Sequence, residues 1–277
     1  MVGERPPRVP AGRAAYWTPM PISPDATDAE LRAFYEDCYT PGAGHGRPSD
    51  AARAGGWRAL CARGKADHVT ALCARAGLAP TRVLEIGCGD GAILGWLAAD
   101  RFAPTLDGCE LSQAAAAIAA GRAGVGEVRA ITGDDLPYAS GSYDLGILSH
   151  VLEHVHEPAV LLAEAARVCS AVIVEVPLED NVSARRPGKR AHALEIGHLQ
   201  RFSRGQMHEV VAQAGLRVSA ELSDPLPREV HRYWADEASG RRRADARWLL
   251  RRALMTVPPL GRRAITVHWA AACVPAP

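Results

Sequence analysis

Short apolar runs alternate with longer amphipathic stretches from residue 80 to the end of the chain. The runs have the length and composition of buried strands at residues 82–86, 105–110, 127–132, 143–149, 170–176, 216–222 and 263–273. Helical spacing of apolar residues occurs near 91–100, 112–122, 157–168 and 203–214. Strands that are separated by helix-length segments predict an α/β fold with a largely parallel sheet and helices on both faces.

The pattern before residue 80 is helical throughout. In DATDAELRAFYEDCY, Thr27 is the expected N-cap of a helix, and Glu30 completes a capping box. A second amphipathic segment covers residues 50–77. We therefore expect an N-terminal helical cap over residues 27–79, preceded by a flexible arm at residues 1–26 that is rich in Pro, Gly and Arg.

Residues 80–277 are expected to form one α/β domain, and the whole chain of 277 residues, 48% hydrophobic, can bury a core of ordinary size. Two of its connections, 177–202 and 224–261, are long enough to carry structure or function of their own. The second contains the basic stretch GRRRADARWLLRRAL, which predicts an inserted helical segment before the last strand.

Charge and composition limit the partners and the location. The net charge of +1 provides no general field for nucleic acid or an anionic membrane, so nucleic acid is an unlikely partner. No apolar run approaches the ~18 residues of a membrane span, and the N-terminus lacks the hydrophobic segment of a signal peptide. The seven cysteines form no C-x-x-C pair, which favours reduced, buried thiols. We expect a cytoplasmic protein without membrane contact.

The stretch VLEIGCGDGAILGWL, residues 83–97, leads from an apolar strand through three glycines into a helix. Gly87 to Ala92 satisfy the dinucleotide pattern G-x-G-x-x-G/A, so a nicotinamide or flavin enzyme has to be considered. Asp90 argues against it, because this carboxylate would stand in the turn that receives the pyrophosphate. A ligand with a sulfonium and an ammonium group suits Glu85 and Asp90 better.

Four motifs follow one another in order: VLEIGCGDG, GCELS, GDDLPYASGSYDLGILSHVLEHVHEP and EAARV. Together they resemble the successive motifs of class I S-adenosylmethionine-dependent methyltransferases over residues 80–176. The segments WRALCARGKADHV, EVPLEDN and EIGHLQRF are also similar to a group of uncharacterised bacterial methyltransferases. The resemblance implies a Rossmann-like fold with a seven-stranded, mostly parallel sheet. It also implies S-adenosyl-L-methionine as cofactor and S-adenosyl-L-homocysteine as product.

The resemblance implies cofactor-binding roles in the glycine turn. Gly87, Gly89 and Gly91 would let the backbone approach the methionyl part of the cofactor. Glu85 would orient this turn and lie near the ammonium group of the cofactor.

Further cofactor contacts are implied after the second, third and fourth strands. Glu110 would accept hydrogen bonds from both ribose hydroxyls, with Leu111 packing on the adenine. Asp134 would accept from the adenine amino group, and the backbone N–H of Asp135 would meet a ring nitrogen. Ser149 would present its carbonyl to the ammonium group.

The segment SHVLEHVHEP contains a possible metal motif. His150, Glu153 and His154 spell the zinc-peptidase pattern H-x-x-E-H, and on a helix positions 150 and 154 would share a face. However, the segment directly follows a buried strand of a nucleotide-type sheet. We therefore expect no metal.

Three histidines are the catalytic candidates. Ligands of open α/β sheets bind at the carboxyl ends of strands, which places His150 beside the reacting methyl group. His154 lies a turn further on, and His198 belongs to the connection that covers the substrate pocket in the resembled family. A neutral histidine can serve as general base for a hydroxyl acceptor near pH 7. The alternative for each is a structural histidine.

The resulting functional hypothesis is methyl transfer to a small-molecule acceptor, with an oxygen such as the hydroxyl of a sugar or natural product favoured. Alternatives are an N-methyltransferase, methylation of a macromolecular or carrier-bound substrate through the basic residues 241–252, and a non-catalytic cofactor-binding protein. The partners considered are a small-molecule acceptor and a second copy of the chain in a homodimer.

Overall fold

The computed structural model describes residues 22–40, 48–133, 135–235 and 238–277, and of residues 48–54 only the backbone. Most of the expected arm, residues 1–26, and the adenine candidate Asp134 therefore lie outside the described residues.

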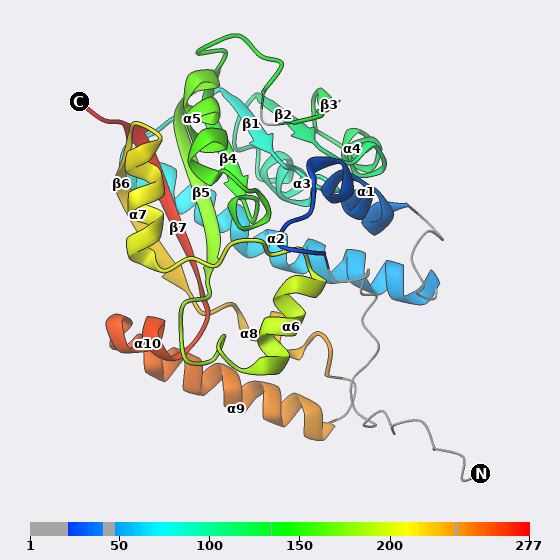
Figure 1. The fold of residues 1–277 in the computed structure, drawn as a ribbon, viewed down its shortest axis with the longest axis vertical. Helices are drawn as coiled ribbons and strands as arrows, with labels where there is room; N and C mark the ends of the chain where they lie inside the picture. Colours follow the sequence, from blue (N-terminus) through cyan, green and yellow to red (C-terminus); the bar gives the residue numbers. More distant parts are fainter. Residues whose placement is uncertain (1–21, 41–47, 134, 236–237) are drawn as a thin grey trace.

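Seven strands of the described chain form one sheet, in the order β3-β2-β1-β4-β5-β7-β6 (Figure 1). They are β1 (Arg82–Ile86), β2 (Thr105–Glu110), β3 (Val128–Ala130), β4 (Tyr143–Ser149), β5 (Cys169–Leu178), β6 (Leu216–Asp224) and β7 (Val267–Pro275). The first five pair in parallel, whereas β7 runs antiparallel to both β5 and β6. The predicted Rossmann-like, mostly parallel sheet is confirmed.

The helices of the described residues are α1 (Asp28–Tyr39), α2 (Pro48–Ala76), α3 (Ala92–Ala99), α4 (Gln113–Ala120), the 3-10 turn η1 (Leu152–His154), α5 (Pro158–Val168), α6 (Pro187–Glu195), α7 (Arg204–Gln213), α8 (Arg228–Arg232), α9 (Ala238–Met255) and α10 (Pro258–Ala264). The capping box at the start of α1 is formed as predicted, with Thr27 accepting from the backbone N–H of Glu30.

Two apolar clusters cover the two faces of the sheet because its strands alternate. On β5, Val172, Val174 and Val176 face the cluster that contains residues of α5 and α7. Ala171 and Ile173 point to the opposite cluster, to which α2 and α3 contribute. Such strands, buried on both faces, are typical of parallel sheets.

The carboxyl ends of the parallel strands meet at one edge of the sheet, and the antiparallel β7 begins at this same edge (Figure 1). The helices α6, α8, α9 and α10 gather beyond it. Polar residues that end β2 and β4 or begin β7 are therefore brought together, whatever their separation along the chain.

Candidate active site

The glycine turn after β1 has a backbone that other residues adopt only with strain. Gly87, Gly89 and Gly91 have φ angles of 71°, 54° and 70°. A Cβ atom at Gly87 would lie 2.6 Å from a methyl carbon of Val151, and one at Gly89 would lie 2.8 Å from the hydroxyl of Tyr39. Both the backbone conformation and the surrounding side chains thus require glycine in this turn.

Glu110, the last residue of β2, ties the end of its strand to the turn. Its carboxylate accepts backbone N–H groups of Gly89 at 2.8 Å, Leu111 at 2.8 Å and Ser112 at 3.0 Å. Burial raises the pKa of Glu110, and these hydrogen bonds oppose the rise. The predicted ribose carboxylate therefore stands beside the predicted methionyl turn.

Two polar groups on the adjacent strands β1 and β4 are buried without a partner. Glu85 is 2% exposed, and its Oε2 has no hydrogen-bond partner among the described residues. Burial raises the pKa of Glu85 to about 8, and the positive charge of Lys65 limits this rise. The hydroxyl of Ser149 is likewise buried and unpartnered in this part of the structure. A polar, positively charged ligand group would satisfy both.

Asp90 is neutralised by the protein itself. Its carboxylate lies 3.1 Å from Nε of Arg58 and 3.4 Å from Nη2 of Arg122. The charge of Asp90 was expected to suit a positive ligand, but two arginines already balance it: Arg58 of α2 and Arg122, which follows α4.

Helix α1 covers the glycine turn, a contact that the sequence did not reveal. Tyr39 packs on the turn and holds the guanidinium of Arg58 5.0 Å from its ring centre. Glu36 accepts from the hydroxyl of Ser112 at 2.8 Å, which joins α1 to the start of α4. The hydroxyl of Tyr35 is buried without a hydrogen-bond partner in the described chain.

The adenine side is less enclosed. Asp135 is exposed and Leu111 is partly buried, while the neighbouring Leu136 is 4% exposed. No described contact tests the adenine roles of Leu111 and Asp135.

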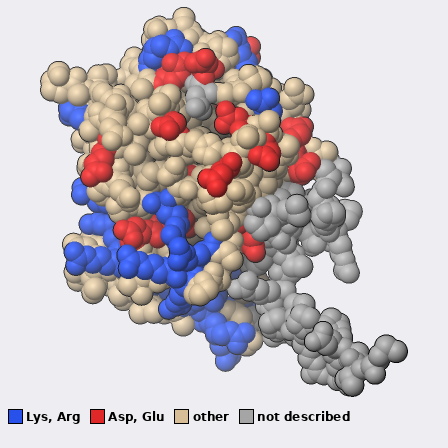
Figure 2. Space-filling view, in the orientation of Figure 1, with Lys and Arg blue, Asp and Glu red and all other residues tan. Residues whose placement is uncertain are grey.

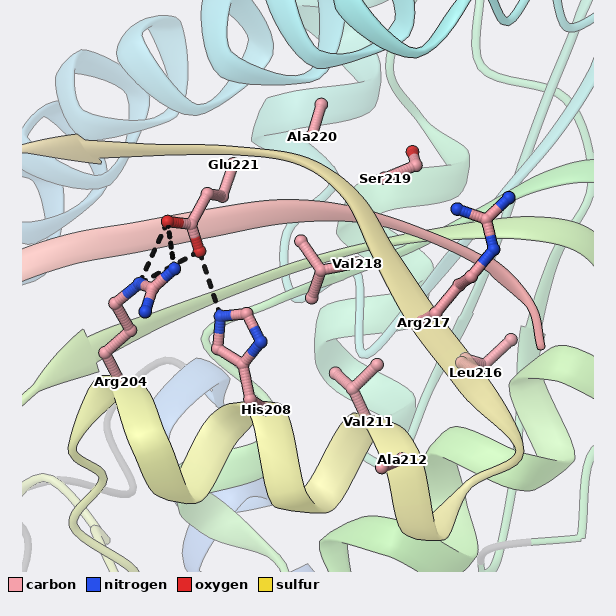
Figure 3. A pocket seen from close by; sticks show the side chains of 10 residues that line it. All are labelled: Arg204, His208, Val211, Ala212, Leu216, Arg217, Val218, Ser219, Ala220 and Glu221. Carbon is pink, nitrogen blue, oxygen red and sulfur yellow. Dashed lines mark hydrogen bonds and ion pairs between the residues drawn. The ribbon is translucent and has the colours of Figure 1, made fainter.

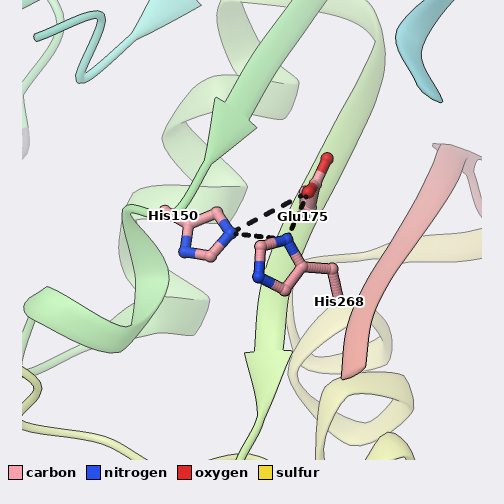
Figure 4. Close-up of side chains that lie close together, drawn as sticks. All are labelled: His150, Glu175 and His268. Carbon is pink, nitrogen blue, oxygen red and sulfur yellow. Dashed lines mark hydrogen bonds and ion pairs between the residues drawn. The ribbon is translucent and has the colours of Figure 1, made fainter. Parts of the chain in front are cut away.

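A chain of histidines and carboxylates crosses the edge of the sheet (Figure 4). Nε2 of His150 lies 3.2 Å from Nδ1 of His268, which donates to Oε1 of Glu175 at 3.1 Å. The second oxygen of Glu175 accepts from Nδ1 of His68 at 3.1 Å, and Nε2 of His68 lies 3.3 Å from Asp224. Three strands, α2 and the residue that follows β4 contribute to this network, in which both oxygens of Glu175 are satisfied.

The members of the network have pKa values that are shifted in different directions. Burial, together with the charges of Lys65 and His268, holds the pKa of His150 well below its usual value. Burial would raise the pKa of Glu175, but its hydrogen bonds to His268 and His68 hold it well below its usual value. For His68, two carboxylate partners outweigh burial and raise the pKa to about 9. His150 is therefore a neutral imidazole at physiological pH.

His154 and His198 belong to a second cluster, centred on Glu153. Their rings lie 4.9 Å apart. Nδ1 of His154 donates to the carbonyl of Gly197 at 2.9 Å, and Nδ1 of His198 donates to Glu179 at 2.8 Å. Burial lowers the pKa of His154 to about 4, whereas the partner carboxylates outweigh burial at His198 and raise its pKa.

The helix on which His150 and His154 would share a face is not formed. Only the single turn η1 (Leu152–His154) follows β4, and His150 precedes it with a φ of 60°. His150 thus joins the network of Glu175, and His154 joins that of His198. Glu153 links the two, because its Oε1 lies 2.9 Å from Nδ1 of His150.

Several residues of both clusters were missed from the sequence, although two gave a visible signal. Glu175 interrupts the apolar strand AVIVEVPL, and His268 interrupts TVHWAAACV. A charged or titratable residue inside a buried strand indicates a polar partner. Glu179 and His68 carried no comparable signal, because they lie in a connection and on a helix.

Two cavities lie near the last strands. One of about 790 Å³ is bounded by α2, α8 and α9, and His68 and Asp224 of the network line it. The other, of about 550 Å³, lies between α7 and the outer strand β6, with Arg204 and His208 bound to Glu221 (Figure 3). Because β6 is the edge strand furthest from β1 on this side of the sheet, the second cavity is separate from the glycine turn.

The basic stretch of the sequence forms an exposed surface. Figure 2 shows Lys and Arg side chains concentrated low on the molecule, where Figure 1 places α9 and α10. Exposed arginines of α9 are Arg241, Arg242, Arg243, Arg247 and Arg252. No helix of the described residues is long and apolar enough to span a membrane.

The comparisons with known proteins agree with this architecture. A family model described as a methyltransferase domain matches residues 57–221, more than half of the chain. No curated protein matches the chain by sequence.

Solved structures share the fold at low identity. Geranyl diphosphate C-methyltransferase from Streptomyces coelicolor A3(2), with Mg²⁺, a substrate analogue and S-adenosyl-L-homocysteine, is 17% identical at a TM-score of 0.55, covering 77% of this chain and 76% of that one. Magnesium protoporphyrin IX methyltransferase from Synechocystis PCC 6803, with S-adenosyl-L-homocysteine, is 12% identical at a TM-score of 0.55, covering 90% and 100%. The [4+2]-cyclase SpnF is 18% identical at a TM-score of 0.54, covering 77% and 81%.

Proposed function

We propose, from the premise that the chain belongs to the S-adenosylmethionine-dependent methyltransferases, that it methylates a hydroxyl oxygen of a small-molecule acceptor. The observation that carries the oxygen assignment is the group of hydrogen-bond acceptors after β4. Both carboxylate oxygens of Glu153 are buried without a hydrogen-bond partner among the described residues. His154 and His198 each use Nδ1 for a protein partner, and no described residue forms a hydrogen bond to Nε2 of either ring.

The cofactor S-adenosyl-L-methionine fits the residues around the glycine turn. Bound there, it supplies the electrophilic methyl group. The orphaned Oε2 of Glu85 is suited to the ammonium end of the cofactor, and so is the carbonyl of Ser149, whose buried hydroxyl also has no partner among the described residues. Glu110 is suited to the ribose hydroxyls, and the glycines leave room for close approach of the backbone.

A hydroxyl acceptor must lose its proton as its oxygen attacks the methyl carbon. In this proposal Glu153, His154 and His198 line the position of the hydroxyl, whose single proton is directed to Nδ1 of His150, beside Oε1 of Glu153. His150 takes the proton, because its low pKa keeps the imidazole neutral and Glu175 with His268 fixes its position. An amine acceptor would lose its proton before attack and would need no such group.

A small acceptor is favoured by the burial of the cluster. Glu153 is 1% and His198 is 7% exposed, so a folded macromolecule could not present a group there without an extended reach. The exposed arginines of α9 keep a carrier-bound acceptor as the second candidate. Cytoplasmic location and a homodimer belong to the same proposal and rest on the sequence alone.

The test is a screen of small-molecule hydroxyl, amine and carrier-linked acceptors with radiolabelled S-adenosylmethionine. Labelled O-methyl product supports the proposal, whereas labelling of amines alone, or of carriers alone, contradicts it. No labelled product with any acceptor, together with normal cofactor binding, would favour a cofactor-binding protein without transfer.

Variants then assign the roles. His150→Ala should lower turnover about 10²- to 10⁴-fold, with cofactor affinity nearly unchanged. His198→Ala and His154→Ala should raise the KM for the acceptor more than they lower kcat, because these side chains bind the hydroxyl. Near-normal turnover of His150→Ala would show that alignment alone is sufficient.

A further inference from the structure

We propose that Glu153, His154 and His198 form a binding site for one divalent transition-metal ion. One observation favours a cation at this point. Glu153 is 1% exposed, yet neither of its carboxylate oxygens has a hydrogen-bond partner in the described part of the chain. A buried carboxylate without a partner is strongly destabilising, so native proteins pair such a group or use it to coordinate a metal.

The neighbours of Glu153 do not provide the missing donor. Nδ1 of His150 lies 2.9 Å from Oε1, but the contact lacks hydrogen-bond geometry, because that oxygen has no hydrogen-bond partner. Lys65, whose charge lowers the pKa values of His150 and His154, makes no hydrogen bond to either oxygen of Glu153. The carboxylate therefore faces a position that has no donor among the described residues.

Both histidines are oriented as metal ligands are. A histidine that binds a metal through one nitrogen usually donates its other N–H to a carboxylate or a backbone carbonyl, which fixes the ring and its tautomer. His154 donates Nδ1–H to the carbonyl of Gly197, and His198 donates Nδ1–H to the carboxylate of Glu179. Each ring thus keeps Nε2 available for a metal.

The distances and the donor types favour a transition metal. One ligand atom from each of the three residues lies within 4.8 Å of the others. An ion at about 2.0–2.2 Å from each atom can be reached by small side-chain movements. Two imidazoles and one carboxylate suit Zn²⁺, Fe²⁺ or Mn²⁺, whereas Mg²⁺ and Ca²⁺ require mostly oxygen ligands.

The network of His150, Glu175 and His268 has a similar composition and serves as an internal contrast (Figure 4). There both carboxylate oxygens of Glu175 already accept hydrogen bonds, from His268 and from His68. A metal would have to break these bonds. The carboxylate of Glu175 thus has hydrogen-bond partners, whereas that of Glu153 has none among the described residues. Only the cluster of Glu153 therefore favours a bound cation.

The chain assembles the site from two distant segments. Glu153 and His154 belong to η1, while His198 arrives because the backbone N–H groups of Leu199 and Gln200 donate to the carbonyl of Glu153 at 2.8 Å and 3.0 Å. Two residues of the sequence motif H-x-x-E-H, Glu153 and His154, thus belong to the proposed site. The third proposed ligand is His198, and not the motif residue His150. The metal site does not depend on the proposed hydroxyl acceptor.

The experiment is a zinc titration of untagged, full-length protein that has been stripped with EDTA and dialysed. Isothermal titration should show one Zn²⁺ per chain and at least about 10-fold weaker Mg²⁺ binding. Glu153→Gln and His198→Ala should abolish this site. Glu179→Gln, which removes the charge of the carboxylate that accepts from Nδ1 of His198, should weaken zinc binding about 10- to 100-fold.

Controls keep the test independent of folding and of catalysis. His208→Gln removes a surface histidine that lies 3.1 Å from Glu221 and should leave zinc binding unchanged. Glu153→Gln loses a buried charge and should unfold at no lower temperature than metal-free wild type. As a second readout, Co²⁺ should give visible absorption bands in wild type that Glu153→Gln lacks. Absence of zinc binding, equal Mg²⁺ affinity, or wild-type binding by Glu153→Gln and His198→Ala would overturn the site.

Discussion

The hydroxyl of Tyr39 lies directly on Gly89, so close that a Cβ atom at Gly89 would come within 2.8 Å of it. The N-terminal helix and the glycine turn are therefore in contact without room for any side chain between them. Since the same helix is joined to α4 through Glu36 and Ser112, it forms a fixed cover over the turn.

Replacing Gly89 should damage cofactor binding. Gly89→Val introduces a branched side chain at a φ of 54° and against Tyr39, which displaces either the turn or α1. We expect the affinity for S-adenosyl-L-homocysteine to fall at least about 10-fold by isothermal titration, the scale for loss of a hydrogen bond to a charged group. Gly64→Ala, in open space on α2, should bind normally. Wild-type affinity of Gly89→Val would contradict this account of the turn.

Removal of the Glu110 carboxylate should weaken cofactor binding by about 1.5–3 kcal/mol, the range for hydrogen bonds to a charged group. Glu110→Ala removes the proposed ribose acceptor and also leaves the N–H of Gly89 without its partner. The same titration measures the effect. Glu127→Ala, which removes an exposed carboxylate directly before β3, is the control. A folded Glu110→Ala protein that binds as wild type does would refute the ribose assignment.

Gly197→Ala should destabilise the fold and disturb His154. Gly197 has a φ of 84°, and a Cβ atom there would lie 2.8 Å from the hydroxyl of Tyr35. We expect a loss of about 1–3 kcal/mol in the free energy of unfolding, measured with urea, from the strained backbone and this contact. Gly141→Ala has a similar φ of 65° with open space around it, so its loss should be smaller. Equal losses would show that the contact with Tyr35 has no effect.

The ion network of His68 should make stability depend on pH. His68 faces Glu175 from β5 and Asp224 from β6, with His268 of β7 beside them. Its pKa in the folded protein, about 9, exceeds the ordinary 6.5. Its contribution is therefore fully present below pH 6.5 and is lost as the pH rises through about 9. Glu175 and Asp224 have lowered pKa values, so their contribution is lost in the opposite direction, as the pH falls below their ordinary values of 4.5 and 3.8.

Urea unfolding of wild type and His68→Gln at several pH values measures this dependence. The difference in free energy of unfolding between the two proteins should be largest near pH 6 and should shrink steadily towards pH 9.5, since His68 then loses its charge in both states. A difference that stays constant over this range would exclude a charged His68.

The fold was predictable from the sequence because its determinants are local. Alternating apolar positions in the strands depend only on the period of the backbone, and the capping box of Thr27 and Glu30 is closed within one helical turn. The glycine turn was recognisable for the same reason: its left-handed φ angles require glycine at consecutive odd positions. The cofactor role of Glu110 was implied by the family resemblance of GCELS, and its position beside the glycine turn follows from the pairing of β1 with β2.

The sequence by itself thus determined the sheet, the glycine turn and the identity of the cofactor family. Tertiary structure decided which charges and histidines meet. Asp90 is paired with Arg58 and Arg122. His198 lies beside His154, although 43 positions separate them, because the backbone N–H groups of Leu199 and Gln200 donate to the carbonyl of Glu153. His150 and His154 stand four positions apart but enter different clusters, because a left-handed residue and a single 3-10 turn replace the expected helix. Side-chain partners of this kind depend on the packing of remote segments, and no local pattern records that packing.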